Sequence, residues 1–186
     1  MAFLGAHRIH RSVVFCLSII FLLGVPSAWA QAVSDIEVKA AFLFNLTQFV
    51  AWPAASLPRN QAPFVIGILG EDPFGAVLDQ TVQGEVVAGR KIVVERYANL
   101  AAVKDCQILF ISRSEERRLN EIWTVLKDRP VLTVADMPQF AKRGGTINLI
   151  TDRNKVRIAV NVSTAQANQL IFSSNLLRVA EVIGGR

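Results

Sequence analysis

Residues 64–73 read FVIGILGEDP, and this stretch decides the fold. Its first six residues are an unbroken apolar run with a single glycine, which is typical of a β-strand buried on both faces. Asp72 and Pro73 then offer a cap and a first position for a short helix that we expect to run to about Gln83. A doubly covered strand that passes directly into a helix predicts a parallel α/β sheet.

Outward from this stretch, five further strands are predicted, at residues 91–97, 106–111, 131–134, 146–150 and 156–162. The last two are separated by about five residues rich in turn formers, so they form a C-terminal β-hairpin that makes the sheet mixed. The other strands alternate with helices. We therefore expect a three-layer α/β/α sandwich with a mixed, mostly parallel six-stranded sheet and about five helices.

Capping boxes at Ser34–Glu37, Ser112–Glu115 and Ser163–Gln166 mark the expected starts of three helices. The first is predicted to run to about Ala51, and Asp136 to cap a further short helix that ends at Gly144. The last box predicts one continuous C-terminal helix. Its two apolar faces hold, respectively, Phe172, Leu176, Val179 and Ile183, and Leu170 and Leu177.

The first helix is apolar on most of its circumference, with one stripe through Ala40 and Leu43 and another through Val38, Phe42, Leu46 and Phe49. Such a helix is either packed in the core on two sides or turns one stripe to a partner protein. The candidate partner-binding residues are Phe42, Leu46 and Phe49, together with Leu170 and Leu177 of the C-terminal helix.

Ligands of open α/β sheets bind outside the carboxyl ends of the strands. The residues expected at that edge are Glu71, Asp72, Ser112 and Asp136, which form a candidate ligand-binding rim. Capping alone explains Asp72 and Asp136 equally well. A carboxylate-based hydrolase that uses these two residues is the enzyme alternative.

Residues 1–30 have the features of a secretory signal peptide. Arg8 and Arg11 precede an apolar run from Val13 to Leu23, and Ala28-Trp29-Ala30 predicts cleavage after Ala30, with an uncleaved anchor as the alternative. Residues 31–186 are then expected to form a single domain in the periplasm. Loss of the two arginines lowers the net charge from +5 to +3. No basic cluster indicates a nucleic-acid partner.

Both histidines of the chain and Cys16 lie in the predicted signal peptide, which leaves Cys106 as the single cysteine of residues 31–186. This composition excludes intrachain Ser-His and Cys-His nucleophile pairs, His/Cys zinc sites and an intrachain disulfide. We therefore predict no catalytic residue, no metal, no cofactor and no enzyme activity. Cys106 opens an apolar strand, so it is either a small buried hydrophobe or an exposed thiol that bridges two molecules.

Residues 39–53, KAAFLFNLTQFVAWP, are the most specific segment of the chain and resemble the start of the YfiR-like family of exported bacterial proteins, long catalogued as a domain of unknown function. Further segments match in order: GILGEDPFG at 67–75, DCQILFI at 105–111, LTVAD at 132–136, and SSNLL at 173–177. The resemblance covers residues 35–182. The best-known members carry paired cysteines, whereas residues 31–186 of this chain hold only Cys106.

The resemblance implies a periplasmic repressor of a membrane-bound diguanylate cyclase. Such a repressor binds the periplasmic sensory region of the cyclase, holds it inactive and so lowers cyclic di-GMP and biofilm formation. Outer-membrane, peptidoglycan-associated lipoproteins can sequester the repressor, and a homodimer is a further candidate assembly. The alternative function is a periplasmic small-molecule sensor that uses the C-terminal rim of the sheet.

Overall fold

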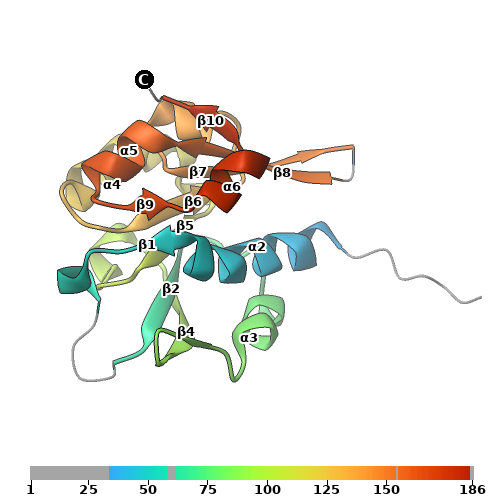
Figure 1. Ribbon diagram of the computed structural model, residues 1–186, viewed down its shortest axis with the longest axis vertical. Coiled ribbons are helices and arrows are strands. Elements are labelled where there is room, and N and C mark those ends of the chain that lie inside the picture. Colours follow the sequence, from blue (N-terminus) through green and yellow to red (C-terminus); the bar gives the residue numbers. More distant parts are fainter. Residues whose placement is uncertain (1–33, 58–61, 154, 185–186) are drawn as a thin grey trace, which may run out of the picture. The chain divides into compact units, whose positions relative to one another are not determined.

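An eight-stranded mixed sheet forms the centre of the domain, in the order β10-β8-β7-β6-β5-β2-β4-β3 (Figure 1). The structure is a computed structural model that describes residues 34–57, 62–153 and 155–184, all within one compact unit, Val33–Arg186. The predicted signal peptide, with its cleavage after Ala30, lies outside the described residues. Over the described ranges, no helix has the length and apolar character that crossing a membrane requires.

All six predicted strands belong to this sheet: β2 (Phe64–Leu69), β4 (Arg90–Tyr97), β5 (Ile108–Ile111), β6 (Leu132–Ala135), β7 (Ile147–Asp152) and β8 (Lys155–Asn161). The first five are parallel, and β8 returns antiparallel to β7 as the predicted hairpin. The α/β fold with a mostly parallel sheet is therefore confirmed.

The prediction of six strands was too low, because very short strands extend the sheet. β3 (Val86–Val87) pairs with β4 at one edge, and β10 (Glu181–Ile183) pairs with β8 at the other. A separate ribbon joins β1 (Val50–Ala51) to β9 (Ile171–Phe172). Two or three residues carry too little periodicity to reveal a strand, and the pairing partners of β9 and β10 lie far away along the chain or beyond a helix.

Helices cover both faces of the sheet. The α-helices are α2 (Asp35–Phe49), α3 (Ala76–Val82), α4 (Leu119–Leu126), α5 (Val162–Ala167) and α6 (Ser174–Val179). Short 3-10 helices are η2 (Ala54–Ser56), η3 (Leu100–Ala102), η4 (Arg113–Arg118) and η5 (Phe140–Arg143). One core cluster joins the sheet to α2, α3, α5 and α6, and a second joins the other face to α4, η3 and η5. This is the predicted three-layer arrangement.

The start of α2 follows the sequence prediction closely. The Glu37 amide donates to Ser34 Oγ at 3.2 Å, and the Ser34 amide donates to Glu37 Oε2 at 2.7 Å, so the capping box is formed. The helix ends at Phe49, two residues before the predicted end, because the chain turns into β1.

The prediction of one C-terminal helix was wrong, because this segment divides into α5, β9, α6 and β10. Gln169 has a left-handed backbone with φ of 59°, which ends the first helical piece. Phe172 then pairs with Val50, and Ser173 Oγ caps the next helix by accepting from the Leu176 amide at 3.3 Å. The cap of α5 is Asn161, whose Oδ1 accepts from the Thr164 amide at 3.0 Å, and not Ser163.

Three other predicted caps were also wrong. Gly75 precedes α3, and Asp72 Oδ1 instead accepts from the Phe74 amide at 2.7 Å in a local turn. Ser112 makes no side-chain cap, and its helix begins as the 3-10 helix η4. Gln139 and not Asp136 precedes η5, and the Asp136 carboxylate instead forms the ion pair with Lys39 that is described below. The predicted helix end at Gly144 is present, with φ of 97°.

Candidate functional site

The carboxyl ends of β2 and β5, where the strand order reverses, leave no open cleft, because the loops that follow the two strands are in direct contact. The Ser112 amide donates to the Leu69 carbonyl at 3.0 Å, and the Glu71 amide donates to Ser114 Oγ at 3.0 Å. Gly70 has φ of +88°, and a Cβ there would lie only 2.9 Å from Glu115 Cγ. Glu71 and Ser112 therefore border packed chain, and neither lines the two cavities described below.

Asp72, the next predicted rim residue, shares Arg96 as an ion-pair partner with Asp79 of α3. Arg96 Nε lies 2.7 Å from Asp72 Oδ2, and its Nη2 pairs with Asp79 and donates to the Gly75 carbonyl at 3.0 Å. The hydrogen bond from Arg96 holds the pKa of Asp79 below its ordinary value. Asp72 and Asp136 thus pair with different cations on different elements, and the sequence-predicted rim is not one site.

Asp136 lines a cavity of about 490 Å³ outside the carboxyl ends of β6 and β7. Lys39 Nζ of α2 lies 2.8 Å from Asp136 Oδ2 and 2.6 Å from Asp35 Oδ2, and Thr151 Oγ1 donates to Asp35 Oδ1 at 2.8 Å. Sequence reasoning missed Lys39, although a lysine four residues after an aspartate on an apolar helix is a usable signal.

Lys39 and Asp35 are held in their charged forms. Burial alone lowers the pKa of Lys39, but its hydrogen bonds to Asp136 and Asp35 outweigh burial and leave the pKa raised. Burial raises the pKa of Asp35, but bonds from Lys39 and Thr151 outweigh that effect and leave it lowered. The network therefore links the N-terminal part of α2 to the end of β6 through the ion pair of Lys39 with Asp136.

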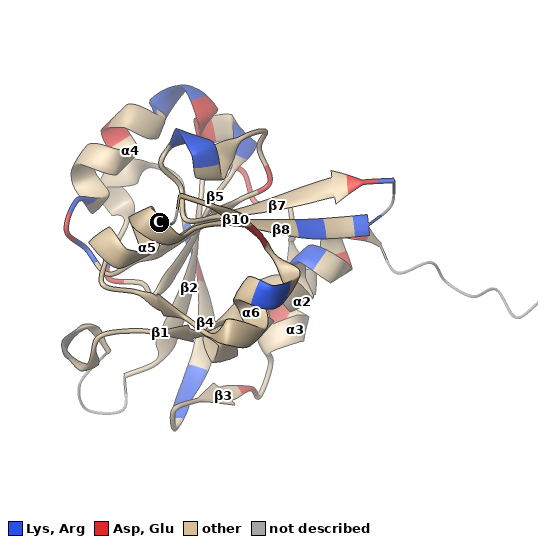
Figure 2. Ribbon diagram, turned by 45° about the horizontal axis from the view of Figure 1, so that its top comes forward, with Lys and Arg blue, Asp and Glu red and all other residues tan. Residues whose placement is uncertain are grey.

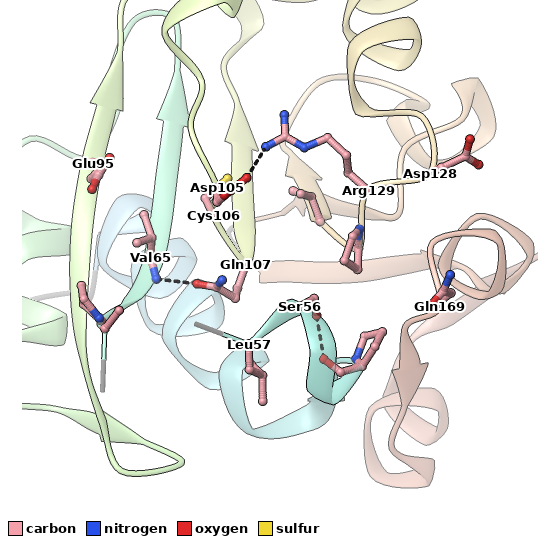
Figure 3. A pocket seen from close by; sticks show the side chains of 15 residues that line it. Ser56, Leu57, Val65, Glu95, Asp105, Cys106, Gln107, Asp128, Arg129 and Gln169 are labelled. Atoms are coloured by element: carbon pink, nitrogen blue, oxygen red, sulfur yellow. Dashed lines mark hydrogen bonds and ion pairs between the residues drawn. The ribbon is translucent and has the colours of Figure 1, made fainter. Parts of the chain in front are cut away.

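A larger cavity, about 720 Å³, opens at the opposite, amino-terminal edge of the parallel strands (Figure 3). Gln107 Oε1 accepts from the Val65 amide at 2.8 Å at its floor, and Arg129 pairs with Asp105 at 3.1 Å. Cys106 is buried here, and burial raises the pKa of its thiol to about 12. A thiol of this kind is a poor nucleophile and a poor disulfide former. No sequence motif marked this edge.

Of the five candidate partner-binding residues, two belong to the core and three pack against it from partly exposed positions. Leu46 is 1% exposed and Leu170 is 2% exposed, whereas Phe42, Phe49 and Leu177 are half-buried against the same cluster. The two most exposed large apolar side chains of the described residues lie instead on the C-terminal segment: Ile171 is 70% exposed and Val179 is 74% exposed. Sequence reasoning had not singled out Ile171 and had placed Val179 on a buried face.

Charged residues elsewhere form local ion pairs rather than a cluster of one sign. Figure 2 shows basic and acidic residues interspersed along the helical turn that leads into α4, which is η4, and at the β7–β8 hairpin. Arg118 pairs with Glu115 and Glu121, and Arg143 pairs with Glu116 at 2.6 Å. In the part of the chain that the structure describes, no three His, Cys, Asp or Glu residues could hold a metal ion together.

Comparison with known proteins gives one family and a general fold. A sequence model of the YfiR/HmsC-like family matches residues 36–181. No curated protein matches the chain. Among solved structures, a conserved domain protein from Vibrio cholerae O1 biovar El Tor is 12% identical with a TM-score of 0.52, over 80% of this chain and 60% of that one.

The ABC domain from Streptococcus pneumoniae in complex with L-Trp is 10% identical with a TM-score of 0.48, over 64% of this chain and 55% of that one. The chain thus spans 55% to 60% of the length of these two structures. At such identities, the Vibrio cholerae structure indicates a shared fold and nothing more.

Proposed function

Because this chain belongs to the YfiR/HmsC-like family of periplasmic regulators in cyclic di-GMP signalling, we propose that it represses a membrane-bound diguanylate cyclase. In this proposal the protein binds the periplasmic sensory region of the cyclase, holds it inactive and lowers cyclic di-GMP and biofilm formation. The family match over residues 36–181 carries the proposal. The protein acts by binding and not as an enzyme.

We place the binding surface on α2 and the C-terminal segment that covers it. Leu46 and Leu170 are in the core, so they shape this surface from below rather than touch a partner. The half-buried Phe42, Phe49 and Leu177 form its accessible part, and Ile171 and Val179 extend it outward. Apolar side chains of this size on a folded surface are a common feature of protein interfaces.

The remaining partners and the location rest on the same family assignment. An outer-membrane, peptidoglycan-associated lipoprotein would sequester the repressor, and a second copy of the chain could form a homodimer. The signal-peptide pattern of residues 1–30 supports export and cleavage after Ala30. Intact-mass measurement of the periplasmic protein, with Gln31 as the expected first residue, tests this part separately.

The test of repression combines a deletion strain with matched surface variants. Deletion should raise cyclic di-GMP, and the tagged protein should co-purify with the cyclase. Ile171→Asp and Val179→Asp should keep the melting temperature but lose both co-purification and repression. Val86→Asp is the matched control, because Val86 is 57% exposed on β3 at the far edge of the sheet. Unchanged cyclic di-GMP on deletion, without co-purification, would overturn the proposal.

A second candidate function is the sensing of a small periplasmic molecule. It is favoured by one observation: Asp136, a predicted rim residue, lines a cavity beside a buried charge network. Ligand binding by a purified protein that shows no cyclase binding would favour this function over the first.

A further inference from the structure

A buried asparagine lines the cavity at the carboxyl ends of β6 and β7. Asn148 of β7 is 2% exposed and lines the cavity. Its Nδ2 donates to the carbonyls of Ala135 at 3.2 Å and Met137 at 3.0 Å, which fixes the orientation of the amide. The side-chain nitrogen therefore faces the chain, and the side-chain oxygen is left for another partner.

That oxygen accepts no hydrogen bond from any described residue. Among the described residues, no side-chain nitrogen or oxygen that is fully buried lacks a partner. Asn148 Oδ1 must therefore retain some exposure, and the cavity that Asn148 lines is where it retains it. A nearly buried acceptor without a donor is costly unless water or a ligand donates to it.

Asp136 adds a second acceptor beside this one. Its Oδ2 accepts from Lys39 Nζ at 2.8 Å, and its Oδ1 accepts from no described residue. Lys39 Nζ also lies between Asp136 and Asp35, and its positive charge opposes a metal ion at these carboxylates. The inner end of a ligand would thus meet a neutral oxygen and a carboxylate oxygen, which is the surrounding that an ammonium group prefers.

Arg113, the first residue of η4, supplies the opposite charge at the exposed side of the cavity. Its Nη2 donates to the Asp136 carbonyl at 3.3 Å, and this is the single hydrogen bond that its guanidinium makes with described residues. The remaining N–H groups are in position to bind a planar carboxylate or a phosphate. Two acidic and two basic residues line the cavity, so its formal charge is zero.

We propose that this cavity binds a small zwitterion, with a protonated amine at Asn148 and Asp136 and a carboxylate or phosphate at Arg113. The positive end of the ligand would lie at the inner side of the cavity, and its negative end at the exposed side. The proposal deepens the second candidate function, and it does not depend on repression of a cyclase, because binding is measured on the purified protein alone.

Paired ligands test the chemistry. Calorimetry on the periplasmic protein would use the twenty common amino acids for the carboxylate arm and phosphoethanolamine for the phosphate arm. At least one should bind, and its N-trimethyl counterpart should bind at least tenfold more weakly, because it keeps the charge but has no N–H to donate. For glycine and phosphoethanolamine these counterparts are glycine betaine and phosphocholine. No heat from any probe at 10 mM (about 10,000 times a Kd of about 1 μM), or equal binding of the methylated forms, would overturn the proposal.

Variants and chemical shifts test the place. Arg113→Gln and Asp136→Asn should each weaken the binding probe at least tenfold, whereas Arg117→Gln, an exposed arginine of the same 3-10 helix, should not change it. Backbone amide shifts on binding should be largest at residues 136–139 and 148–151. Shifts centred on residues 105–107 and 129–131 would place the ligand in the amino-terminal cavity and overturn the assignment.

Discussion

The first helix and the C-terminal segment carry similar sequence signals, yet one of them forms a continuous helix and the other does not. Both have apolar residues at helical spacing on two sides, and both were predicted to begin at a capping box. α2 runs unbroken for 15 residues, whereas residues 162–183 divide into two short helices and two short strands. A helical pattern of apolar residues thus indicates which side chains are buried, but not that the backbone between them is continuous.

The two regions differ in what competes with the helix. In α2, the capping box and the ion pair of Lys39 with Asp35 stabilise helical backbone locally. In the C-terminal segment, the pairing of β9 with β1 gives backbone hydrogen bonds that a helix cannot keep at the same time. Tertiary pairing therefore overrides local preference in the second region.

Removal of a core side chain should show the largest difference between the two regions. Leu46→Ala in α2 should lower the free energy of unfolding by about 3–4 kcal/mol, since a cavity is left in close-packed core. Leu177→Ala in α6 should cost about 1 kcal/mol, because that side chain is half-exposed. Urea denaturation measures both, and equal costs would mean that the C-terminal segment is packed as tightly as α2.

Loss of the buried lysine should have the next largest effect. Lys39→Met leaves Asp35 and Asp136 without their cation and should cost about 2–3 kcal/mol near pH 7. Lys91→Met is the control, because Lys91 is exposed and makes no ion pair with a described residue. A cost below that of the control variant would show that the network does not anchor α2.

The same variant has a signed pH dependence. The raised pKa of Lys39 means that its contribution is full below the unfolded value of about 10.4 and is lost as pH rises through the folded value. The lowered pKa of Asp35 means that its contribution is full above about 3.9 and is lost as pH falls through the folded value. The difference between Lys39→Met and wild type should therefore be flat from about pH 5 to pH 9 and shrink on either side.

Replacement of the helix-capping residues should lower the free energy of unfolding by smaller amounts, and these amounts should differ between the two regions. Asn161→Ala should cost about 1–2 kcal/mol, because Asn161 caps α5 and also donates to the Ala141 carbonyl at 2.8 Å. Ser34→Ala should cost about 1 kcal/mol through the capping box of α2. Ser163→Ala should cost about 0.5 kcal/mol, since Ser163 donates to the Gly184 carbonyl instead of capping. Thermal melts in which Ser163→Ala costs more than Asn161→Ala would support the capping box that the sequence predicts.

The smallest expected effect comes from Gln169, the residue at which the C-terminal segment stops being helical after α5. Gln169→Gly should stabilise the protein by about 0.5 kcal/mol, because glycine removes left-handed strain that exceeds its cost in unfolded-chain entropy. Gln166→Gly, the same replacement three residues earlier within α5, should destabilise by about 1 kcal/mol. If both variants destabilise equally in chemical denaturation, residues 162–172 are one helix in solution.

The strands with the plainest sequence signal are the ones whose burial is complete, although the partly buried β4, β7 and β8 were also predicted. β2 and β5 are continuous apolar runs, β6 is interrupted only by Thr133, and the structure buries every residue of each. The residues of β1, β9 and β10 become strands through partners that no local window contains. For the same reason, Asp136 could be predicted at the sheet edge, since it follows a strand, but its pairing with Lys39 could not, because 97 residues separate the two.

Asn148 shows a different limit of sequence reasoning. An asparagine within a predicted strand has no pattern that distinguishes a solvated side chain from a buried one, and only the packing of Ala135 and Met137 against it fixes its orientation. The cavity at the amino-terminal edge is hidden in the same way, because its walls come from six separate stretches of chain.

The pairing of β1 with β9 also determines when the core around α2 can form during synthesis of the chain. Val50 meets Phe172 about 120 residues later, a stretch that takes a ribosome roughly 6–24 s to make. Until then, the apolar side of α2 has none of the C-terminal side chains that cover it, and such exposed surface favours aggregation. Contacts this distant in sequence also slow folding. The domain therefore cannot complete its core around α2 before its C-terminal segment has been synthesised.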